Sequence, residues 1–212
     1  MPSTRRSADP APAAPTVDGR PVGDRMLGWV LLMAALVGEA ASLTLSVERF
    51  RLAADQGSLP SCDLNPVLSC GSIMSTPQAS AFGFPNPLLG VAGFAVVATA
   101  GAALLAGARL AGWFWVGLHL GAVGGLVFVH WLIMQSLYVI GALCPYCMVV
   151  WVCTVVIFWY VTLESLRRWT TPGRSGAVGV LQRYHVLPVV GGGAVIVVLI
   201  AIRFWDYWRT LL

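Results

Sequence analysis

Two pairs of cysteines are the residues of this chain best suited to do chemistry. Cys144 and Cys147 form a Cys-x-x-Cys sequence that opens a long apolar run. A disulfide within such a pair closes a very short ring and is poorly suited to stabilising a fold. Backbone amides at a helix start lower the pKa of a nearby thiol, which produces the thiolate that disulfide exchange requires. Pro145 suits the first turn of that helix. The motif therefore predicts a redox-active dithiol.

The second pair, Cys62 and Cys70, is separated by seven residues in a predicted loop. A loop of this kind is placed to reach outward to a soluble thiol protein and inward to Cys144, which would make the four cysteines an electron relay. A redox pair at a membrane surface also needs an acceptor, and a lipid-soluble quinone is the natural one. Aromatic side chains on the adjoining helices offer such a ring a surface, namely Trp131, Tyr138 and Trp151.

Other interpretations of these residues stay open. Both pairs are alternatively structural disulfides of a non-enzymatic membrane scaffold, since an exported compartment tolerates disulfides. Four cysteine ligands would suit zinc, but the first pair is loosely spaced and an oxidising face disfavours free thiolates. His119 and His130 would suit haem only with partner histidines on a second helix, and His185 alone remains. We therefore expect no metal, and we interpret Cys153 as a small buried apolar residue.

The elements that must position these cysteines are transmembrane helices. Hydrophobic residues make up 58% of the 212 residues, charged residues make up 10%, and the mean hydropathy is +0.78. This composition is too apolar for an ordinary soluble domain, and helices are expected because unpaired backbone groups are costly in hydrocarbon. A bilayer core needs roughly 20 apolar residues per helix. Five stretches qualify and predict an all-α integral membrane protein: Met26–Val47, Leu88–Ala108, Trp113–Leu137, Cys144–Leu166 and Val186–Phe204.

This prediction divides the chain into four regions. Residues 1–25 lack an apolar run and are expected to form a disordered cytoplasmic tail, not a cleavable signal. Residues 26–166 hold four helices and an extracytoplasmic loop at residues 48–87. A cytoplasmic loop at residues 167–185 leads to a fifth helix and a short outer C-terminus in residues 186–212.

The arginines predict the orientation of the chain, because positive charge favours the cytoplasmic ends of membrane helices. Nine arginines fall on one side of the predicted spans: Arg5, Arg6, Arg20, Arg25, Arg109, Arg167, Arg168, Arg174 and Arg183. The other side has Arg49, Arg51, Arg203 and Arg209. The N-terminus is therefore predicted to be cytoplasmic and the two cysteine pairs to lie outside. The net charge of +4 is an orientation signal, and no nucleic-acid partner is expected.

With these cysteines and five spans, the chain resembles the vitamin K epoxide reductase family, in particular its bacterial members. Oxidases of the DsbB type are the nearest rivals, but they place the closely spaced cysteine pair before the wide pair, and here the order is reversed. The resemblance covers residues 27–166 and rests on three segments: Cys62-Asp63-Leu64-Asn65-Pro66 through Ser69-Cys70-Gly71-Ser72, Phe82-Gly83-Phe84-Pro85-Asn86-Pro87-Leu88-Leu89-Gly90, and Cys144-Pro145-Tyr146-Cys147.

The resemblance implies a four-helix bundle that encloses a quinone pocket at its outer end, with the fifth helix outside the bundle. Cys62 and Cys70 would be the shuttle pair, Cys70 would exchange with Cys144, and Cys147 would lie nearest the quinone. The implied enzyme of the bacterial plasma membrane reoxidises an extracytoplasmic thioredoxin-like (DsbA-like) protein and reduces a menaquinone, ubiquinone or vitamin K type quinone, which supports disulfide bond formation. Since the chain has no fused thioredoxin-like domain, this donor is expected to be a separate protein.

Three single residues carry further expectations. Asn86 stands where the family has an asparagine that hydrogen-bonds a quinone carbonyl, and its alternative role is to cap the helix that begins at Pro87. Trp151 stands where vertebrate members have a tyrosine, so the resemblance implies quinone reduction and leaves epoxide reduction open. Glu39 lies inside the first span, where a charge costs about 2.5–3.5 kcal/mol on insertion scales. It is therefore expected to face protein or to be protonated.

Overall fold

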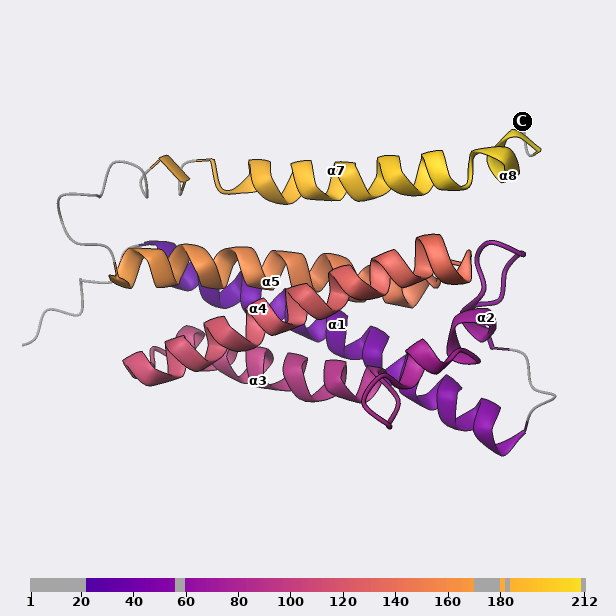
Figure 1. Ribbon diagram of the computed structural model, residues 1–212. Coiled ribbons are helices and arrows are strands. Elements are labelled where there is room, and N and C mark those ends of the chain that lie inside the picture. Colours follow the sequence, from indigo (N-terminus) through magenta and orange to yellow (C-terminus); the bar gives the residue numbers. More distant parts are fainter. Residues whose placement is uncertain (1–21, 56–59, 170–179, 182–183, 211–212) are drawn as a thin grey trace, which may run out of the picture.

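The computed structural model describes residues 22–55, 60–169, 180–181 and 184–210, and its long elements are all helices (Figure 1). Five of them are long and apolar enough to cross a membrane, which confirms the predicted all-α membrane fold. The predicted tail before residue 22 and most of the predicted loop at residues 167–185 lie outside the described residues. The elements are α1 (Val22–Ala54), α2 (Cys70–Met74), the 3-10 helix η1 (Pro77–Ser80), α3 (Pro87–Leu105), α4 (Gly112–Met134), the π-helix η2 (Gln135–Ile140), α5 (Pro145–Trp169), α7 (Val186–Arg203) and α8 (Trp205–Arg209).

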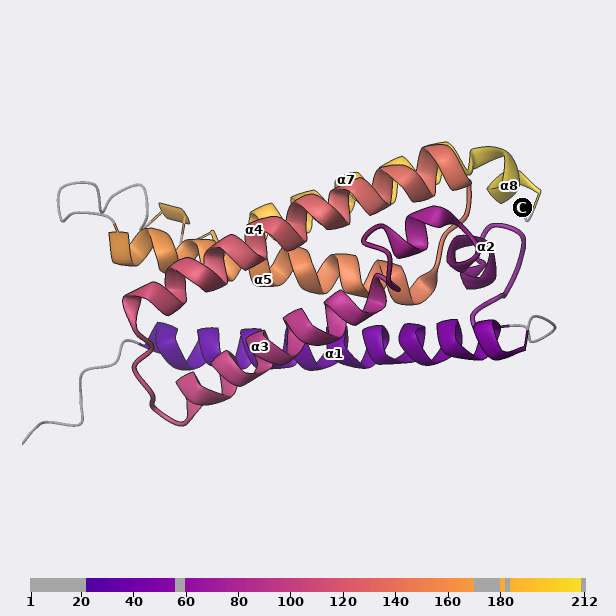
Figure 2. The same cartoon turned by 60° about the horizontal axis from the view of Figure 1, so that its bottom comes forward.

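Four helices, α1, α3, α4 and α5, form the bundle (Figures 1 and 2). α1 packs along α3 and α5, and α5 packs against α4. α1 and α3 approach closely, since a Cβ atom on Gly101 would lie only 2.7 Å from the backbone nitrogen of Leu32. Small residues allow membrane helices to approach in this way. Large apolar side chains from all four helices fill the centre, among them Leu31, Phe94, Trp115, Ile157 and Val161.

The fifth long helix, α7, runs along the outside of the bundle (Figure 1). None of the residues described in α7 is buried. It is attached near both ends: the Trp159 Nε1 atom donates a 2.7 Å hydrogen bond to the His185 carbonyl, and the Arg203 Nε atom donates a 2.8 Å hydrogen bond to the Leu137 carbonyl. The fifth helix therefore lies outside the four-helix core, as predicted, yet it is held to the core by these hydrogen bonds and by apolar packing of Ile196, Leu199 and Ile200.

Two helices extend beyond the ends expected from hydropathy. α1 continues to Ala54, so the start of the loop predicted at residues 48–87 is helical. Charged residues ended the apolar run there, but Arg51 lies 3.6 Å from Glu48 one turn earlier, and such pairs stabilise a helix. The third predicted span, expected to end at Leu137, continues as η2.

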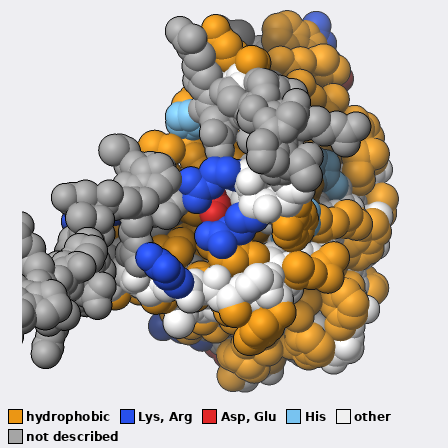
Figure 3. Space-filling view, turned by 90° about the vertical axis from the view of Figure 1, so that its left-hand side faces the viewer, with side chains coloured by type: hydrophobic (Ala, Val, Ile, Leu, Met, Phe, Trp, Pro, Cys, Tyr) orange, Lys and Arg blue, Asp and Glu red, His pale blue; other side chains and the backbone are white. Residues whose placement is uncertain are grey.

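Arginines gather at one end of the bundle, where α1 begins, α3 connects to α4, and α5 ends. The described arginines at this end are Arg25, Arg109, Arg167 and Arg168. Figure 3 views this end and shows basic side chains around an acidic one. Glu164, only 6% exposed, forms ion pairs of 2.8 Å with Arg167 and 2.6 Å with Arg168. The guanidinium of Arg168 also lies 4.5 Å from the ring centre of Trp115, so this end is held by charge as well as by packing.

Candidate redox site

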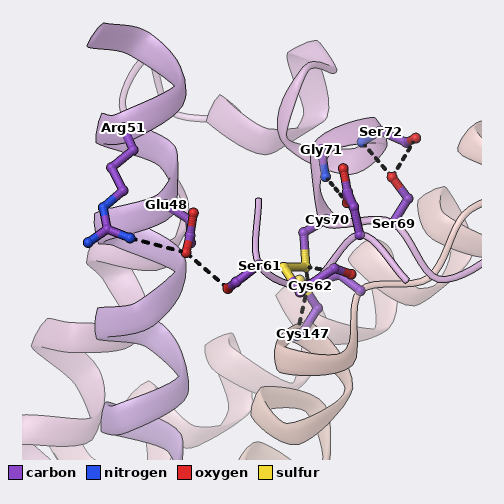
Figure 4. Close-up of a disulfide and its surroundings, with 11 residues drawn as sticks. Glu48, Arg51, Ser61, Cys62, Ser69, Cys70, Gly71, Ser72 and Cys147 are labelled. Carbon is purple, nitrogen blue, oxygen red and sulfur yellow. Dashed lines mark hydrogen bonds and ion pairs between the residues drawn. A yellow bond between two sulfur atoms is a disulfide. The ribbon is translucent and has the colours of Figure 1, made fainter. Parts of the chain in front are cut away.

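The four cysteines predicted to form a relay meet at the opposite end of the bundle. Cys62 and Cys70 form a disulfide with a Cα–Cα distance of 5.7 Å, whereas Cys144 and Cys147 are free thiols. The Cys70 and Cys144 sulfur atoms lie 3.1 Å apart, and both residues are almost fully buried. Figure 4 shows the disulfide directly beside Cys147. The geometry brings a disulfide sulfur within reach of a thiol, which is what exchange requires.

A short backbone pairing holds the loop against the start of α5. Leu143 donates a 2.7 Å hydrogen bond to the Val67 carbonyl, and its own carbonyl accepts a 2.9 Å bond from the Ser69 amide. The side-chain oxygen of Asn65 accepts from the amides of Val67 and Leu68 and fixes the turn before the pairing. Cys70 and Cys144 each follow this pairing by one residue, which accounts for their contact.

A small helix, α2, begins at Cys70, and two side chains accept hydrogen bonds from the amides of its first turn. Ser69 is the N-cap, and its Oγ atom accepts a 3.1 Å hydrogen bond from the Ser72 amide. Gly71, labelled in Figure 4, donates a 2.9 Å hydrogen bond from its amide to the Asp63 carboxylate. A Cβ atom on Gly71 would lie 2.7 Å from the Asp63 carboxylate, so glycine allows this close approach.

The segment before Cys62 is tied to α1 by a buried carboxylate. Glu48 is 7% exposed, and its Oε1 atom accepts a 3.0 Å hydrogen bond from Ser61 Oγ (Figure 4). Arg51 partly neutralises the carboxylate from the solvent side at 3.6 Å. Directly after Glu48 on α1, Arg49 donates a 2.6 Å hydrogen bond to the Met74 carbonyl at the end of α2. The helical extension of α1 therefore anchors both ends of the disulfide loop.

Local hydrogen bonds favour the thiolate form of Cys144. The neighbouring Cys147 thiol is the largest influence that lowers the pKa of Cys144, and the amides of Cys147 and Tyr146 lower it further. Burial and the Asp63 carboxylate act in the opposite direction, but the net effect is a lowered pKa. The Cys147 amide lies 3.4 Å from the Cys144 sulfur, as expected for a residue at the N-terminal end of a helix. Cys144 is therefore suited to thiol–disulfide exchange with Cys70, because its sulfur is stabilised as a thiolate.

The connection that carries Cys144 departs from regular helical geometry. α4 widens into the π-helix η2, and the following Gly141 has φ 72°, in the left-handed region that favours glycine. The Gly141 amide donates to the Ser136 carbonyl at 3.0 Å, and the Ser136 hydroxyl donates to the Ala142 carbonyl. π-Helical turns of this kind are frequent at functional sites. Here the turn directs the chain from α4 into the pairing that ends at Cys144.

A cavity of about 550 Å³ begins beside the cysteines, within the range of about 300–1,000 Å³ that is typical of small-molecule sites. Cys70, Cys144 and Cys147 line it, together with mostly apolar residues from α1, α3, α4 and α5. Its lining residues on α4 extend from Trp113 to Leu132, which is almost the whole length of that helix. The cavity is therefore long, apolar and in contact with the free thiols.

The predicted aromatic residues divide into two groups. Trp151 is 3% exposed and lines the cavity, as does Asn86. Trp131 and Tyr138 are 38% and 53% exposed and are not among the described residues that line it. Contrary to expectation, these two side chains are therefore not part of the cavity wall. Phe128 lines the cavity instead, and its ring centre lies 5.8 Å from that of Trp131. Sequence reasoning also missed six polar residues of the lining. A polar residue beside or within an apolar span is the signal that could have found them: Ser42, Arg49, Gln78, Gln135, Ser136 and Thr154.

Asn86 binds the loop instead of capping α3. It occupies the N-cap position, but its side chain makes no capping hydrogen bond within the described residues. Its Nδ2 atom donates a 2.7 Å bond to the Gln78 carbonyl, and its Oδ1 atom accepts a 3.0 Å bond from the Ala81 amide. The capping interpretation was therefore wrong. One N–H of the amide remains after these two bonds, and the residue lines the cavity.

The histidines set aside in the sequence have separate surroundings. His119 packs against Phe158 and Trp169, and His130 is exposed, with Nδ1 2.8 Å from the Leu126 carbonyl. Cys153 is buried in the apolar centre of the bundle.

Within the described part of the chain, the potential metal ligands that converge are the sulfurs of Cys62, Cys70 and Cys144, which lie within 4.8 Å of one another. Two of these three sulfurs are joined as a disulfide, so the cluster is suited to exchange rather than to metal binding. Glu39 places one carboxylate oxygen in a buried position without a hydrogen-bond partner among the described residues.

A bundle of membrane-spanning helices that brings a loop disulfide into contact with a Cys-x-x-Cys thiol defines a membrane thiol–disulfide oxidoreductase. Residues 29–162 match the vitamin K epoxide reductase family, and the chain belongs to that family. The family implies a quinone as the general class of electron acceptor. A comparison with curated proteins finds no match.

Proposed function

We propose that this protein oxidises an extracytoplasmic thioredoxin-like protein and passes the electrons through its two cysteine pairs to a membrane quinone. One observation supports the proposal above all others: Cys144 lies 3.1 Å from the disulfide sulfur of Cys70 and also lines the cavity together with Cys147. The same thiol therefore contacts the loop disulfide on one side and a site for a lipid-soluble acceptor on the other.

The first half of the proposed reaction transfers electrons from the donor to the Cys-x-x-Cys pair. The reduced donor attacks the Cys62–Cys70 disulfide and leaves as an oxidised protein, which generates two loop thiols. The Cys70 thiolate then attacks Cys144 of an oxidised Cys144–Cys147 pair, and Cys147 leaves as a thiolate. Attack by Cys62 on Cys70 restores the loop disulfide and frees Cys144, which is the redox state of the present structure.

The second half of the proposed reaction reduces the quinone. Cys144 and Cys147 give up two electrons and two protons as they form a disulfide, and the quinone becomes a hydroquinone. The lining of the cavity supports a lipid-soluble acceptor, since it is mostly apolar and follows α4 toward the far end of the bundle. Cβ atoms on Gly93, Gly117 and Gly121 would meet open space, so the walls leave room for an apolar tail.

The donor must open the loop before it can react. Cys62 is 4% exposed and Cys70 is fully buried, so neither sulfur is directly accessible in this state. Ser61 and its bond to Glu48 hold the adjacent segment in place. Donor binding that moves this segment would expose Cys62, which therefore is the sulfur we propose the donor attacks.

We also propose that the cysteine end faces the extracytoplasmic side of a bacterial plasma membrane. Arg25, Arg109, Arg167 and Arg168 lie at the opposite end, and nine of the 13 arginines in the sequence fall on that side of the predicted spans, which is the distribution favoured for cytoplasmic helix ends. This orientation puts the N-terminus in the cytoplasm and the loop disulfide where a secreted donor can reach it. The orientation is tested with Ser75→Cys and Ala108→Cys, each introduced singly into a variant in which all five native cysteines are replaced. Intact cells are treated with a thiol reagent that does not cross the membrane, and labelling of Ala108→Cys alone would contradict the proposed orientation.

The test of the enzymatic proposal is quinone reduction by the purified full chain with a dithiol donor. Wild type is compared with Cys70→Ala, Cys147→Ala and the matched control Cys153→Ala, which removes a free thiol that does not line the cavity. We expect the first two variants to lose turnover and the control to retain it. Unchanged turnover in both Cys70→Ala and Cys147→Ala would favour the scaffold with structural disulfides instead. Menaquinone, ubiquinone and vitamin K quinone are assayed in parallel to identify the acceptor.

A further inference from the structure

A hydroxyl group on α1 is buried at the cavity wall without a partner. Thr44 and Ser46 on the same helix donate hydrogen bonds of 2.9 and 2.8 Å to the carbonyls four residues earlier, which is the usual solution for a hydroxyl in an apolar helix. Ser42 is 1% exposed, and its Oγ atom has no hydrogen-bond partner within the described chain. It lines the cavity. A buried hydroxyl without a partner is unfavourable, so its position requires an explanation.

Two neighbouring residues place this hydroxyl within the site. Leu45, one turn along α1 from Ser42, packs in the cluster that contains Cys70 and Cys144. On the facing helix, the Ser42 hydroxyl lies against Gly90, where a Cβ atom would collide with it. Glycine at this position therefore leaves room for the hydroxyl group.

Asn86 lies one turn before Gly90 on α3, about 6 Å along the axis at 1.5 Å per residue. Residues four apart share one face of a helix, so the amide of Asn86 and the hydroxyl beside Gly90 lie along the same wall of the cavity. Asn86 retains one N–H beyond its two loop bonds, and Ser42 retains its O–H. The wall thus offers two hydrogen-bond donors about one helical turn apart in otherwise apolar surroundings.

We propose that the Ser42 hydroxyl is a substrate-binding group that donates a hydrogen bond to one ring oxygen of the quinone, while the free N–H of Asn86 serves the other. This inference rests on the proposed function and assigns the polar contacts of the same site. A quinone carries two carbonyl oxygens on opposite sides of its ring, so a wall with two separated donors matches its chemistry. As electrons enter the ring, negative charge builds on these oxygens and both hydrogen bonds strengthen.

The first test compares Ser42→Ala with Ser46→Ala in quinone reduction. Both remove a buried hydroxyl from α1, but Ser46 bonds back to its own helix and does not line the cavity. Loss of one hydrogen bond should lower kcat/KM for the quinone by about three- to tenfold in Ser42→Ala. Kinetics for the dithiol donor should be unchanged, and Ser42→Thr should retain part of the activity because it keeps the hydroxyl. Wild-type quinone kinetics in Ser42→Ala, or an equal loss in Ser46→Ala, would overturn the assignment.

The second test observes the contact directly and needs no turnover. Infrared difference spectra of a quinone labelled with carbon-13 at one carbonyl at a time report which carbonyl is hydrogen-bonded, in the full chain carrying Cys147→Ala. We expect Ser42→Ala to return one carbonyl stretch to its unbonded frequency and to leave the other unchanged. A bound quinone with both carbonyl bands unaltered would overturn the role of Ser42 and leave the proposed function intact. Absence of quinone binding and of turnover in the wild-type chain would overturn both.

Discussion

Replacement of Arg203 by methionine should loosen the connection that carries Cys144. The Arg203 Nε atom donates a 2.8 Å hydrogen bond to the carbonyl of Leu137 within η2, and the Leu137 side chain is fully buried. The variant keeps an aliphatic side chain but leaves this carbonyl without its charged donor. Hydrogen bonds from charged groups contribute about 1.5–3 kcal/mol, which corresponds to about a 10- to 150-fold change in a local opening equilibrium. α7 would then lose this hydrogen bond to the bundle and keep its apolar packing against α4 and α5.

Amide hydrogen exchange of residues 136–143 measures this opening in the purified protein. We expect exchange there to accelerate by about 10- to 150-fold in Arg203→Met, with little change in α1 and α3. Arg209→Met is the matched control, because its 2.7 Å ion pair with Asp206 joins side chains that are 61% and 91% exposed. Such a surface pair contributes only about 0–1 kcal/mol. Unchanged exchange in Arg203→Met, or equal acceleration in both variants, would refute the reasoning.

Three other outcomes are expected. Alkylation of Cys144, with the loop disulfide intact, should persist to lower pH than alkylation of an ordinary thiol, because hydrogen bonds lower the pKa of Cys144. Mass spectrometry measures the rate of alkylation, which should fall as the pH drops through that pKa; the pH profile of an ordinary thiol would contradict this. Asn86→Ala should lower the midpoint of thermal unfolding and raise the quinone KM, since it removes two loop hydrogen bonds of about 1 kcal/mol each; Ala106→Ser, at the far end of the same helix, serves as the control. Gly101→Leu should prevent recovery of monodisperse protein on size exclusion because its side chain would meet the α1 backbone, whereas Gly93→Ala faces open space and should behave as wild type.

The sequence predicted the helices and the two cysteine pairs because these depend on local signals. Apolar runs of sufficient length define membrane helices, and the Cys-x-x-Cys spacing at a helix start is itself a chemical signature. The helix boundary at Ala54 was missed because the side chains that extend α1 are charged. Their stabilising contacts include Arg49 with the distant Met74 carbonyl, which no local pattern contains.

The lining of the cavity was harder to predict, and Trp131 and Tyr138 illustrate why. In a membrane protein the lipid face and the interior are both apolar, so hydropathy does not separate them, and aromatic residues suit either. η2 begins at Gln135 and changes the helical period, so Tyr138 does not continue the face expected from α4. Phe128 and Ser42 reach the cavity through the packing of helices distant in sequence, which only the folded structure reveals.

The position of Cys144 has a consequence for the order of steps in the proposed reaction. A sulfur atom forms one disulfide at a time, and that of Cys144 lies 3.1 Å from Cys70 on one side and beside Cys147 on the other. While Cys144 is bonded to Cys70, Cys147 is a free thiol at the cavity; while Cys144 is bonded to Cys147, the loop is released to meet its donor. The two half-reactions therefore alternate. Burial of Cys62 and Cys70 in the present state fits this alternation, since the loop disulfide is shielded while the electrons reside on the pair that faces the quinone cavity.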